Sequence, residues 1–309
     1  MANTAVLKEF DNCVLCPREC RANRNAGQLG YCGCDASYNI ASVCIHKGEE
    51  PPVNGKNGIC NLFFTGCNLR CSFCQNYQIS RRKSANQKEQ NLQDIMQEII
   101  SCLDSGIEAI GFVSPTHHVP HVKEIIRELH RRNFHPVTVY NTNAYDKVSV
   151  LKDLEGLIDV YLPDFKYLDS EVAKSFSDAT GYPEIAKEAI KEMYRQKGSS
   201  VILNENGQAI TGMIVRHLVL PGQSDDSVKI MQWIAEELSS SVHVSLMSQY
   251  YPTACVGGHP VLGRKITEEE YTRVLNAMEE FGFYRGWIQE YESSVTYRPD
   301  FDRSNPFEV

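Results

Sequence analysis

Apolar and polar residues follow a regular pattern along the chain from residue 60 onward. Short apolar runs, rich in β-branched and aromatic residues, are separated by longer stretches whose apolar residues recur every three or four positions. Runs of the first kind are typical of buried strands, and stretches of the second kind are typical of amphipathic helices. Six strands are therefore predicted, at 60–66, 109–115, 135–143, 157–165, 213–222 and 241–250.

Helices are predicted between these strands from the spacing of apolar side chains. Stripes with helical spacing occupy 92–103, 122–129, 228–238 and, after the last strand, 267–281. Because strands and helices alternate, we expect an α/β fold with parallel strands joined by right-handed crossovers. A hairpin with a two-residue turn at Asn206 and Gly207 interrupts the alternation between the fourth and fifth strands.

The stretch before residue 60 has a different character. It is rich in Cys, Asn, Gly and Arg and shows little amphipathic periodicity, and ten of the twelve cysteines of the chain lie before residue 75. We therefore predict a small Cys-rich metal-binding module over 1–59, followed by a larger domain over 60–309.

Composition also limits the partners and the compartment. The 309-residue chain has a formal net charge of −8, which gives no general attraction for nucleic acid or anionic lipid. Its start lacks the pattern of a secretory signal, and no apolar run is long enough to span a bilayer. We expect a cytoplasmic protein with neither nucleic acid nor membrane as a partner. In that reducing compartment, clustered cysteines are better interpreted as metal ligands than as disulfides.

Polar residues follow the predicted strands, at the end where parallel α/β folds bind their ligands. The fifth strand carries Arg216 and His217 side by side, so only one of the two is expected to point inward. His217 is either a cofactor contact or a buried core histidine. The candidates at the ends of the second, third and fourth strands are Ser114, Thr116, Asn141, Thr142, Asp164 and Lys166.

The first strand ends in a loop with three cysteines. Cys67, Cys71 and Cys74 form a C-x3-C-x2-C motif. A structural zinc site needs four ligands, and this loop supplies three. A 4Fe-4S cluster held by three thiolates leaves one iron open for a substrate or cofactor, which suits a loop at a strand end. We therefore predict an open iron–sulfur cluster here rather than zinc or inert thiols.

A second group of cysteines lies nearer the N-terminus. Cys13, Cys16, Cys20 and Cys32 follow the pattern C-x2-C-x3-C-x11-C, which is enough for four-coordinate zinc or a fully ligated second cluster. Cys34 competes with Cys32 for the fourth position. A metal site is expected, but its metal stays open between zinc and iron–sulfur. An auxiliary cluster would relay electrons, whereas zinc would only stabilise the module.

These motifs resemble those of the radical S-adenosylmethionine (SAM) superfamily, whose C-x3-C-x2-C loop has an aromatic residue, here Phe73, before the third cysteine. Over nearly the whole chain, the pattern is similar to that of uncharacterised homologues of pyruvate formate-lyase activating enzyme. The stretches that carry the resemblance are CVLCPREC, GYCG, FFTGCNLRCSFCQNYQIS, FVSPTHHVP, YLPDFKY, VRHLVLPG and LMSQYYP.

The resemblance implies a partial (β/α)6 TIM-like barrel with the 4Fe-4S cluster at its mouth. It implies that SAM binds the open iron through its amino and carboxylate groups, and that Phe73, Asp164 and Lys166 lie at the SAM site. Asn141 and Thr142 match a strand end where activating enzymes bind a monovalent cation, although Asp is usual in the family at the position of Asn141.

A second departure from the family pattern concerns the methionine amine of SAM. Many members of the superfamily place Gly-Gly-Glu at the second strand to hold this amine, whereas this chain has the sequence VSPTHH there. Ser114 and Thr116 could replace the missing groups through a hydroxyl or a backbone carbonyl.

Three functions are compatible with the sequence. In the first, a 5'-deoxyadenosyl radical removes hydrogen from a glycine of a glycyl radical enzyme; in the second, it acts on a small molecule or another peptide residue. The third is a non-catalytic, metal-stapled binding module. The two enzymatic functions require an electron donor such as flavodoxin or ferredoxin, and the basic run at 80–84 could receive an acidic donor.

Overall fold

One open sheet forms the centre of the computed structural model, which describes residues 7–81, 90–291, 293, 298–303 and 305–307. In the described residues the strand order is β1-β2-β3-β4-β5-β7-β8-β9, and β6 pairs only with β7. The strands are β1 Ile40–His46, β2 Ile59–Phe64, β3 Ala109–Val113, β4 Val137–Thr142, β5 Val160–Pro163, β6 Ile202–Leu203, β7 Ala209–Leu218, β8 His243–Met247 and β9 Gly286–Ile288.

All six predicted strands are confirmed, as β2, β3, β4, β5, β7 and β8. They are parallel and neighbour one another in chain order. The structure adds a strand at each edge of this series, β1 antiparallel to β2 and β9 parallel to β8. Because β1 and β9 do not pair with each other, the sheet stays an open, partial (β/α)6 barrel, as the sequence predicted.

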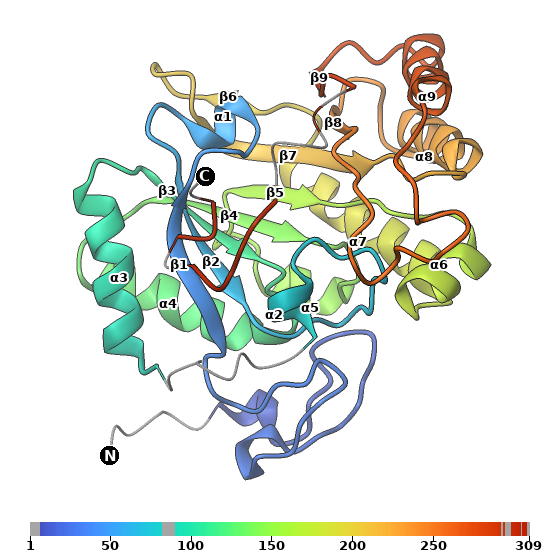
Figure 1. Ribbon diagram of the computed structural model, residues 1–309. Coiled ribbons are helices and arrows are strands. Elements are labelled where there is room, and N and C mark those ends of the chain that lie inside the picture. The colour runs from blue at the N-terminus through green and yellow to red at the C-terminus, as the bar shows by residue number, and fades with distance from the viewer. Residues whose placement is uncertain (1–6, 82–89, 292, 294–297, 304, 308–309) are drawn as a thin grey trace.

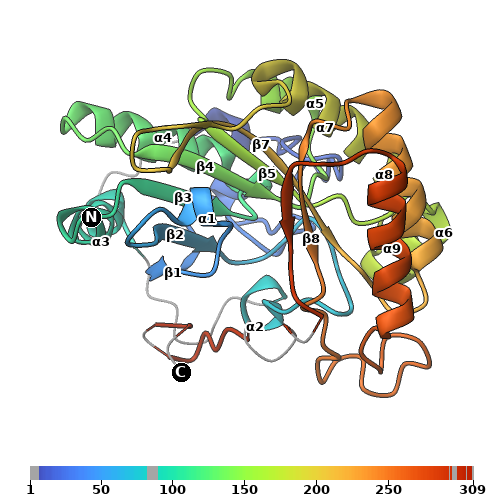
Figure 2. The same ribbon diagram turned by 90° about the horizontal axis from the view of Figure 1, so that it is seen from above.

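Helices cover the outer face of the curved sheet (Figure 1, Figure 2). Their ends agree with local capping signals: Asn91 accepts hydrogen bonds from the first turn of α3, and Thr267 does the same for α9. The helices are α1 Pro51–Asn54, α2 Tyr77–Ser80, α3 Leu92–Asp104, α4 Val119–Arg131, α5 Val148–Lys152, α6 Ser170–Ser177, α7 Tyr182–Lys197, α8 Ser224–Glu237 and α9 Glu268–Glu280.

The alternation of side chains along the strands creates two different layers. On the outer face, residues such as Leu62, Phe112 and Val215 pack against the helices in one large core. On the inner face, a smaller cluster that includes Val139 and Ile214 fills the amino-terminal end of the barrel. The carboxyl end of the inner face is left for polar residues, because the apolar cluster does not reach it.

The hairpin between the fourth and fifth predicted strands is present, but its turn differs from the prediction. Leu203 pairs with Ala209, and the Gly207 N–H donates to the Asn204 carbonyl across a tight turn. Gly207 has a φ of +76°, so this is a three-residue loop with a glycine bulge rather than a two-residue turn. A bulge accommodates the extra residue where a two-residue turn cannot.

Figure 1 shows the segment before β1 as a loop-rich lobe near the carboxyl ends of the central strands. It contains two short 3-10 turns, Lys8–Phe10 and Arg24–Ala26. The division of the chain at residue 59 stays a prediction, while β1, inside the predicted module, is part of the sheet. Among the described residues, no helix is both long and apolar enough to cross a membrane.

Candidate functional site

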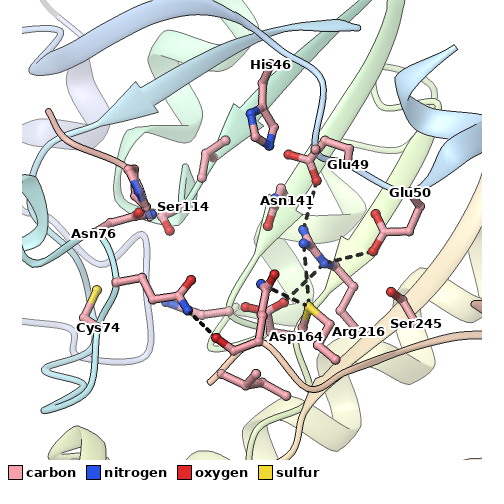
Figure 3. Close-up of a pocket in the computed structure, with 18 of the residues that line it drawn as sticks. His46, Glu49, Glu50, Cys74, Asn76, Ser114, Asn141, Asp164, Arg216 and Ser245 are labelled. Atoms are coloured by element: carbon pink, nitrogen blue, oxygen red, sulfur yellow. Dashed lines mark hydrogen bonds and ion pairs between the residues drawn. The ribbon is translucent and has the colours of Figure 1, made fainter. Parts of the chain in front are cut away.

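A cavity of about 310 Å³ lies on the inner face of the sheet, near the carboxyl ends of the strands (Figure 3). Strand alternation explains its polar wall, since Asn141 of β4, Arg216 of β7 and Ser245 of β8 all occupy inward positions. Most of the predicted site residues line this one cavity, namely Cys67, Cys71, Cys74, Phe73, Ser114, Asn141, Asp164 and Lys166.

The cysteine loop follows β2 and is tied down at several points. Gly66 has a φ of +71°, and a β-carbon there would collide with the Cys32 carbonyl and the Cys34 thiol. The backbone N–H of Arg70 donates to the Ser177 carbonyl at 3.0 Å, which fastens the loop to the end of α6. The fold therefore presents the thiols of this loop to the cavity from a held backbone, which is the arrangement that a bound group needs.

The three thiols each lie near a polar hydrogen. The Asn143 side-chain amide is 3.5 Å from the Cys67 sulfur, the Ser177 hydroxyl is 3.0 Å from Cys71, and the Ser80 hydroxyl is 3.4 Å from Cys74. Such donors stabilise thiolate ligands and tune a bound cluster.

Electrostatics within the loop keep the proton on Cys67 unless a metal replaces it. Burial and the proximity of Cys71 and Cys74 raise the pKa of Cys67 to about 12. Three thiolates this close repel one another unless cationic metal balances them. The loop supplies three thiolates, which leave one iron of a 4Fe-4S cluster open, whereas a closed zinc site needs four ligands.

Asp164 and Lys166 form the ion pair beside this loop. Their charged atoms are 2.7 Å apart, and the two side chains are mostly buried in the cavity wall. Burial alone would lower the pKa of Lys166, but Asp164 and Cys71 outweigh it and raise that pKa. Tyr182 holds the turn, since its hydroxyl lies 2.7 Å from the Asp164 carbonyl and accepts from the Lys166 N–H at 3.0 Å. A charged pair in this position can bind an amino acid carboxylate and amine.

Ser114 lies at the carboxyl end of β3 with a φ of +53°, a strained value for a residue with a side chain. Its N–H donates to the carbonyl of Asn141 at 2.8 Å, so the strain accompanies a contact between two neighbouring strand ends. Ser114 and Asn141 both line the cavity.

Two predicted residues, Thr116 and Thr142, lie behind the cavity wall. Both are buried, with their hydroxyl oxygens 3.4 Å apart, and Thr142 donates to a carboxylate oxygen of Asp146 at 2.5 Å. Burial raises the pKa of Asp146. The structure thus places these threonines in a network beneath the site rather than at its surface.

His217 is a buried core histidine rather than a cavity residue, which is the second of the two alternatives that the sequence left open. One ring nitrogen lies 2.7 Å from the Phe165 carbonyl and the other 2.8 Å from the Ser227 hydroxyl, on the outer face of the sheet. Burial lowers the pKa of His217 to about 4, so the ring is neutral near pH 7. As expected from strand alternation, only one of the neighbouring pair, Arg216, points into the cavity.

Sequence reasoning missed several polar residues in the cavity wall, among them His46, Glu49 and Glu50. His46 is the last residue of β1, an antiparallel edge strand, and the two glutamates follow it, so none of the three lies at the end of a predicted strand. A usable signal was the pair of adjacent glutamates immediately before Pro51, ahead of the first predicted strand.

The four predicted N-terminal ligands also come together. Burial, and then the nearby Cys32, Cys13 and Cys20, raise the pKa of Cys16 to about 12. The backbone of Gly30 lies against the sulfur atoms of both Cys20 and Cys32. Four thiols are enough for one zinc ion or for a fully ligated iron–sulfur cluster.

Cys34 lies beside Cys32 but belongs to a different contact set. Its thiol is 3.2 Å from the Thr65 carbonyl, which also contacts a ring nitrogen of His117 at 2.8 Å. The ligand atoms of Cys32, Cys34 and His117 all lie within 4.8 Å of one another. Cys32 therefore lies near both the other N-terminal cysteines and the pair Cys34 and His117. This position favours Cys32 over Cys34 as the fourth member of the N-terminal set.

Comparison with known proteins defines the class of protein. The model of the radical SAM superfamily matches residues 61–234, more than half of the chain, and the chain belongs to this superfamily. Its members carry out radical chemistry with SAM and a 4Fe-4S cluster. An uncharacterised protein of Methanocaldococcus jannaschii is 30% identical over 279 residues, which cover 88% of this chain and 75% of the relative.

Solved structures with a similar arrangement are more distant. Streptococcus suis SuiB bound to S-adenosylmethionine is 14% identical, with a TM-score of 0.48 over 72% of this chain, and the match spans about half of SuiB (48%). The enzyme anSMEcpe with bound AdoMet is 12% identical, with a TM-score of 0.49 over 73% of this chain and 61% of the other. A domain of pyruvate-formate lyase-activating enzyme from Bacteroides vulgatus is 14% identical, with a TM-score of 0.38 over 56% of this chain and 93% of that domain.

Proposed function

We propose that the chain is a radical SAM enzyme that binds a 4Fe-4S cluster through Cys67, Cys71 and Cys74. The observation that carries the proposal is that these three thiols, from one loop, line the same cavity as the Asp164–Lys166 ion pair. When bound, the cluster and SAM would supply a 5'-deoxyadenosyl radical that removes a hydrogen atom from a substrate.

In this proposal, residues of the cavity wall bind SAM and keep water away from it. The Lys166 ammonium would pair with the SAM carboxylate, and Asp164 would accept a hydrogen bond from its amine or ribose. Phe73 is buried in the cavity wall and lies 6.0 Å from Tyr250 between ring centres, so this part of the wall is apolar. An apolar wall excludes water, which would otherwise screen the electrostatic interactions in the site.

The N-terminal cysteines, Cys13, Cys16, Cys20 and Cys32, would bind a second metal group in this proposal. Four thiols suit either zinc or a fully ligated iron–sulfur cluster, and the metal stays open between the two. A β-carbon at Gly66 would collide with the Cys32 carbonyl, so a group bound by Cys32 would lie next to the catalytic loop. An auxiliary cluster at this position would relay electrons from a donor such as flavodoxin or ferredoxin. Part of the basic run at 80–84, proposed to receive that donor, lies outside the described residues.

The substrate is better supported as a small molecule or a peptide side chain than as the glycine of a glycyl radical enzyme. Pro299 and Phe307, near the C-terminus, line the cavity, and Phe307 packs on Phe63 and His46. These contacts narrow the approach that a folded partner's loop would need. Activation of a glycyl radical enzyme remains the second candidate, favoured by the sequence resemblance.

Anaerobic reconstitution with iron and sulfide tests the proposal. With SAM and dithionite, the protein should release 5'-deoxyadenosine, and Cys71→Ser should release none because the loop loses a cluster ligand. Cys255→Ser is the matched control, because Cys255 is exposed and outside the cavity. Absence of 5'-deoxyadenosine from a protein that carries its full iron would instead favour the non-catalytic binding module.

A further inference from the structure

Two buried glutamates share one arginine in the cavity wall. The side chains of Glu49 and Glu50 are only 6% and 5% exposed. Arg216 contacts both of them, at 3.2 Å in each case, and lies 3.9 Å from Asp164 (Figure 3). We call His46, Glu49, Glu50 and Arg216 the acidic corner.

The charges of this corner do not balance. Two carboxylates face one guanidinium, while the nearest other cation, Lys166, lies 2.7 Å from Asp164 and is paired with it. Burial lowers the pKa of His46, so the imidazole is neutral near pH 7 and adds no positive charge. Buried carboxylates are normally paired with cations, so one more positive charge fits this corner.

Three polar atoms in the corner make no hydrogen bond to any described residue: Glu50 Oε2, His46 Nδ1 and Arg216 Nε. Arg216 Nε still faces Glu50 Oε1 at 3.2 Å in an ion pair. Glu50 and His46 both line the cavity and are more than nine-tenths buried. Buried polar groups in native proteins are nearly always satisfied, so unpartnered atoms at a cavity wall indicate a missing ligand.

A bare metal ion does not suit this geometry. Among the described residues, the oxygen and nitrogen atoms of His46, Glu49 and Glu50 do not all lie within 4.8 Å of one another. An organic cation carries several N–H donors on one charge, so it can satisfy separated acceptors at once.

The position of the corner fits a substrate contact. Figure 3 shows Glu49, Glu50 and Arg216 on one side of the cavity and Cys74 on the other, with Asp164 between them. A molecule anchored at the corner would therefore extend toward the cysteine loop. We propose that the acidic corner binds a positively charged group of the substrate, an ammonium or a guanidinium, on a small molecule or a peptide side chain. This inference rests on the proposed function, because the bound molecule is a substrate only if the chain is a radical SAM enzyme.

Calorimetric titration of the reconstituted protein with SAM present tests the inference. The probes are putrescine, agmatine and L-lysine, with 1,4-butanediol as the neutral counterpart of putrescine and acetate as an anion. At least one cation should bind ten-fold or more tightly than the butanediol. Glu50→Gln should weaken that binding at least about ten-fold, since a charged hydrogen bond is lost. Binding of putrescine or agmatine but not of L-lysine would assign a small amine substrate rather than a peptide side chain.

The controls separate a lost contact from a lost fold. Glu188→Gln changes an exposed glutamate of α7 and should leave the affinity unchanged. Glu49→Gln provides a second test if Glu50→Gln does not fold, and it should weaken the same probe. The inference is overturned if no cation exceeds butanediol, if acetate binds instead, or if both Gln variants keep the wild-type affinity. Release of 5'-deoxyadenosine is measured separately, so its failure would count against the proposed function and not against the corner.

Discussion

The two cysteine-rich regions use the same ligand in different surroundings. In the loop after β2, Cys67, Cys71 and Cys74 are partly exposed and line a cavity with a polar wall. In the N-terminal segment, Cys13, Cys16 and Cys32 are buried, and Cys20 is exposed.

Protein groups cover three of the four N-terminal thiols. Nearby, Arg24 is 1% exposed, lies over the ring of Phe10, and donates to the carbonyls of His117 and Asp35. A set of four thiols can saturate a metal, whereas three thiols at a cavity leave one position open. The difference teaches that ligand count and access, rather than residue type, separate a reactive metal site from a structural or electron-relaying one.

The largest expected effect follows removal of a ligand from the open site. Cys74→Ala should abolish SAM cleavage and remove the four irons assigned to the loop, since two thiolates do not retain the cluster. The N-terminal metal should remain, because Cys74 belongs to the other set. Iron analysis and chromatography of 5'-deoxyadenosine measure both effects. Retention of full activity would remove this loop from the catalytic account.

The matching change in the closed site should affect metal content first. The double variant Cys13→Ala with Cys16→Ala should lose one metal group, four irons for a cluster or one zinc for a zinc site, while the loop keeps its own irons. Because metal binding stabilises such modules, proteolysis should cut the segment before β1 faster than in the wild type. Unchanged iron and zinc contents would contradict the second metal site.

The contact of the N-terminal segment with the turn after β3 gives the next effect. Arg24→Leu leaves the His117 and Asp35 carbonyls without their buried donor, and we expect a loss of about 3 kcal/mol in the free energy of unfolding. Urea denaturation of the reconstituted protein measures it. Arg273→Leu is the control, because Arg273 is exposed on α9 and should cost less than about 0.5 kcal/mol. Equal losses for both variants would contradict a buried role for Arg24.

The smallest effect concerns the cofactor contact at the open site. Lys166→Met removes the ammonium paired with Asp164, and the Kd for SAM should rise about ten-fold or more, since hydrogen bonds to charged groups contribute about 1.5–3 kcal/mol. Equilibrium dialysis with labelled SAM gives the constant. Metal content should not change, because Lys166 is not a thiolate ligand. An unchanged Kd would place SAM elsewhere in the cavity.

Much of the fold follows from local pattern, and the exceptions have physical reasons. The six central strands are buried on both faces, so their apolar runs stand out in the sequence. Strand β1 is an edge strand with mixed burial and β9 has three residues, so neither carries a clear periodic signal. Edge elements depend on pairing with the existing sheet, which a local pattern does not record.

The candidate site was predictable where its residues follow a strand. Asp164 and Lys166 follow β5 and line the cavity as expected. The strand-end rule does not distinguish a residue at the cavity surface from one behind it, which is why Thr142 was included. It also omits residues that arrive from an antiparallel strand, which is why Glu50 was missed. Both differences concern tertiary placement rather than residue chemistry.

The central claim is that the loop cluster has an iron open to SAM, and electron–nuclear double resonance tests it most directly. The sample is the reduced protein lacking Cys13 and Cys16, so that only the loop signal remains, with SAM labelled with ¹⁵N at its amine. The account predicts a hyperfine coupling between the cluster spin and that nitrogen. A cluster signal without any coupling, in a sample shown by dialysis to be saturated with SAM, would contradict it.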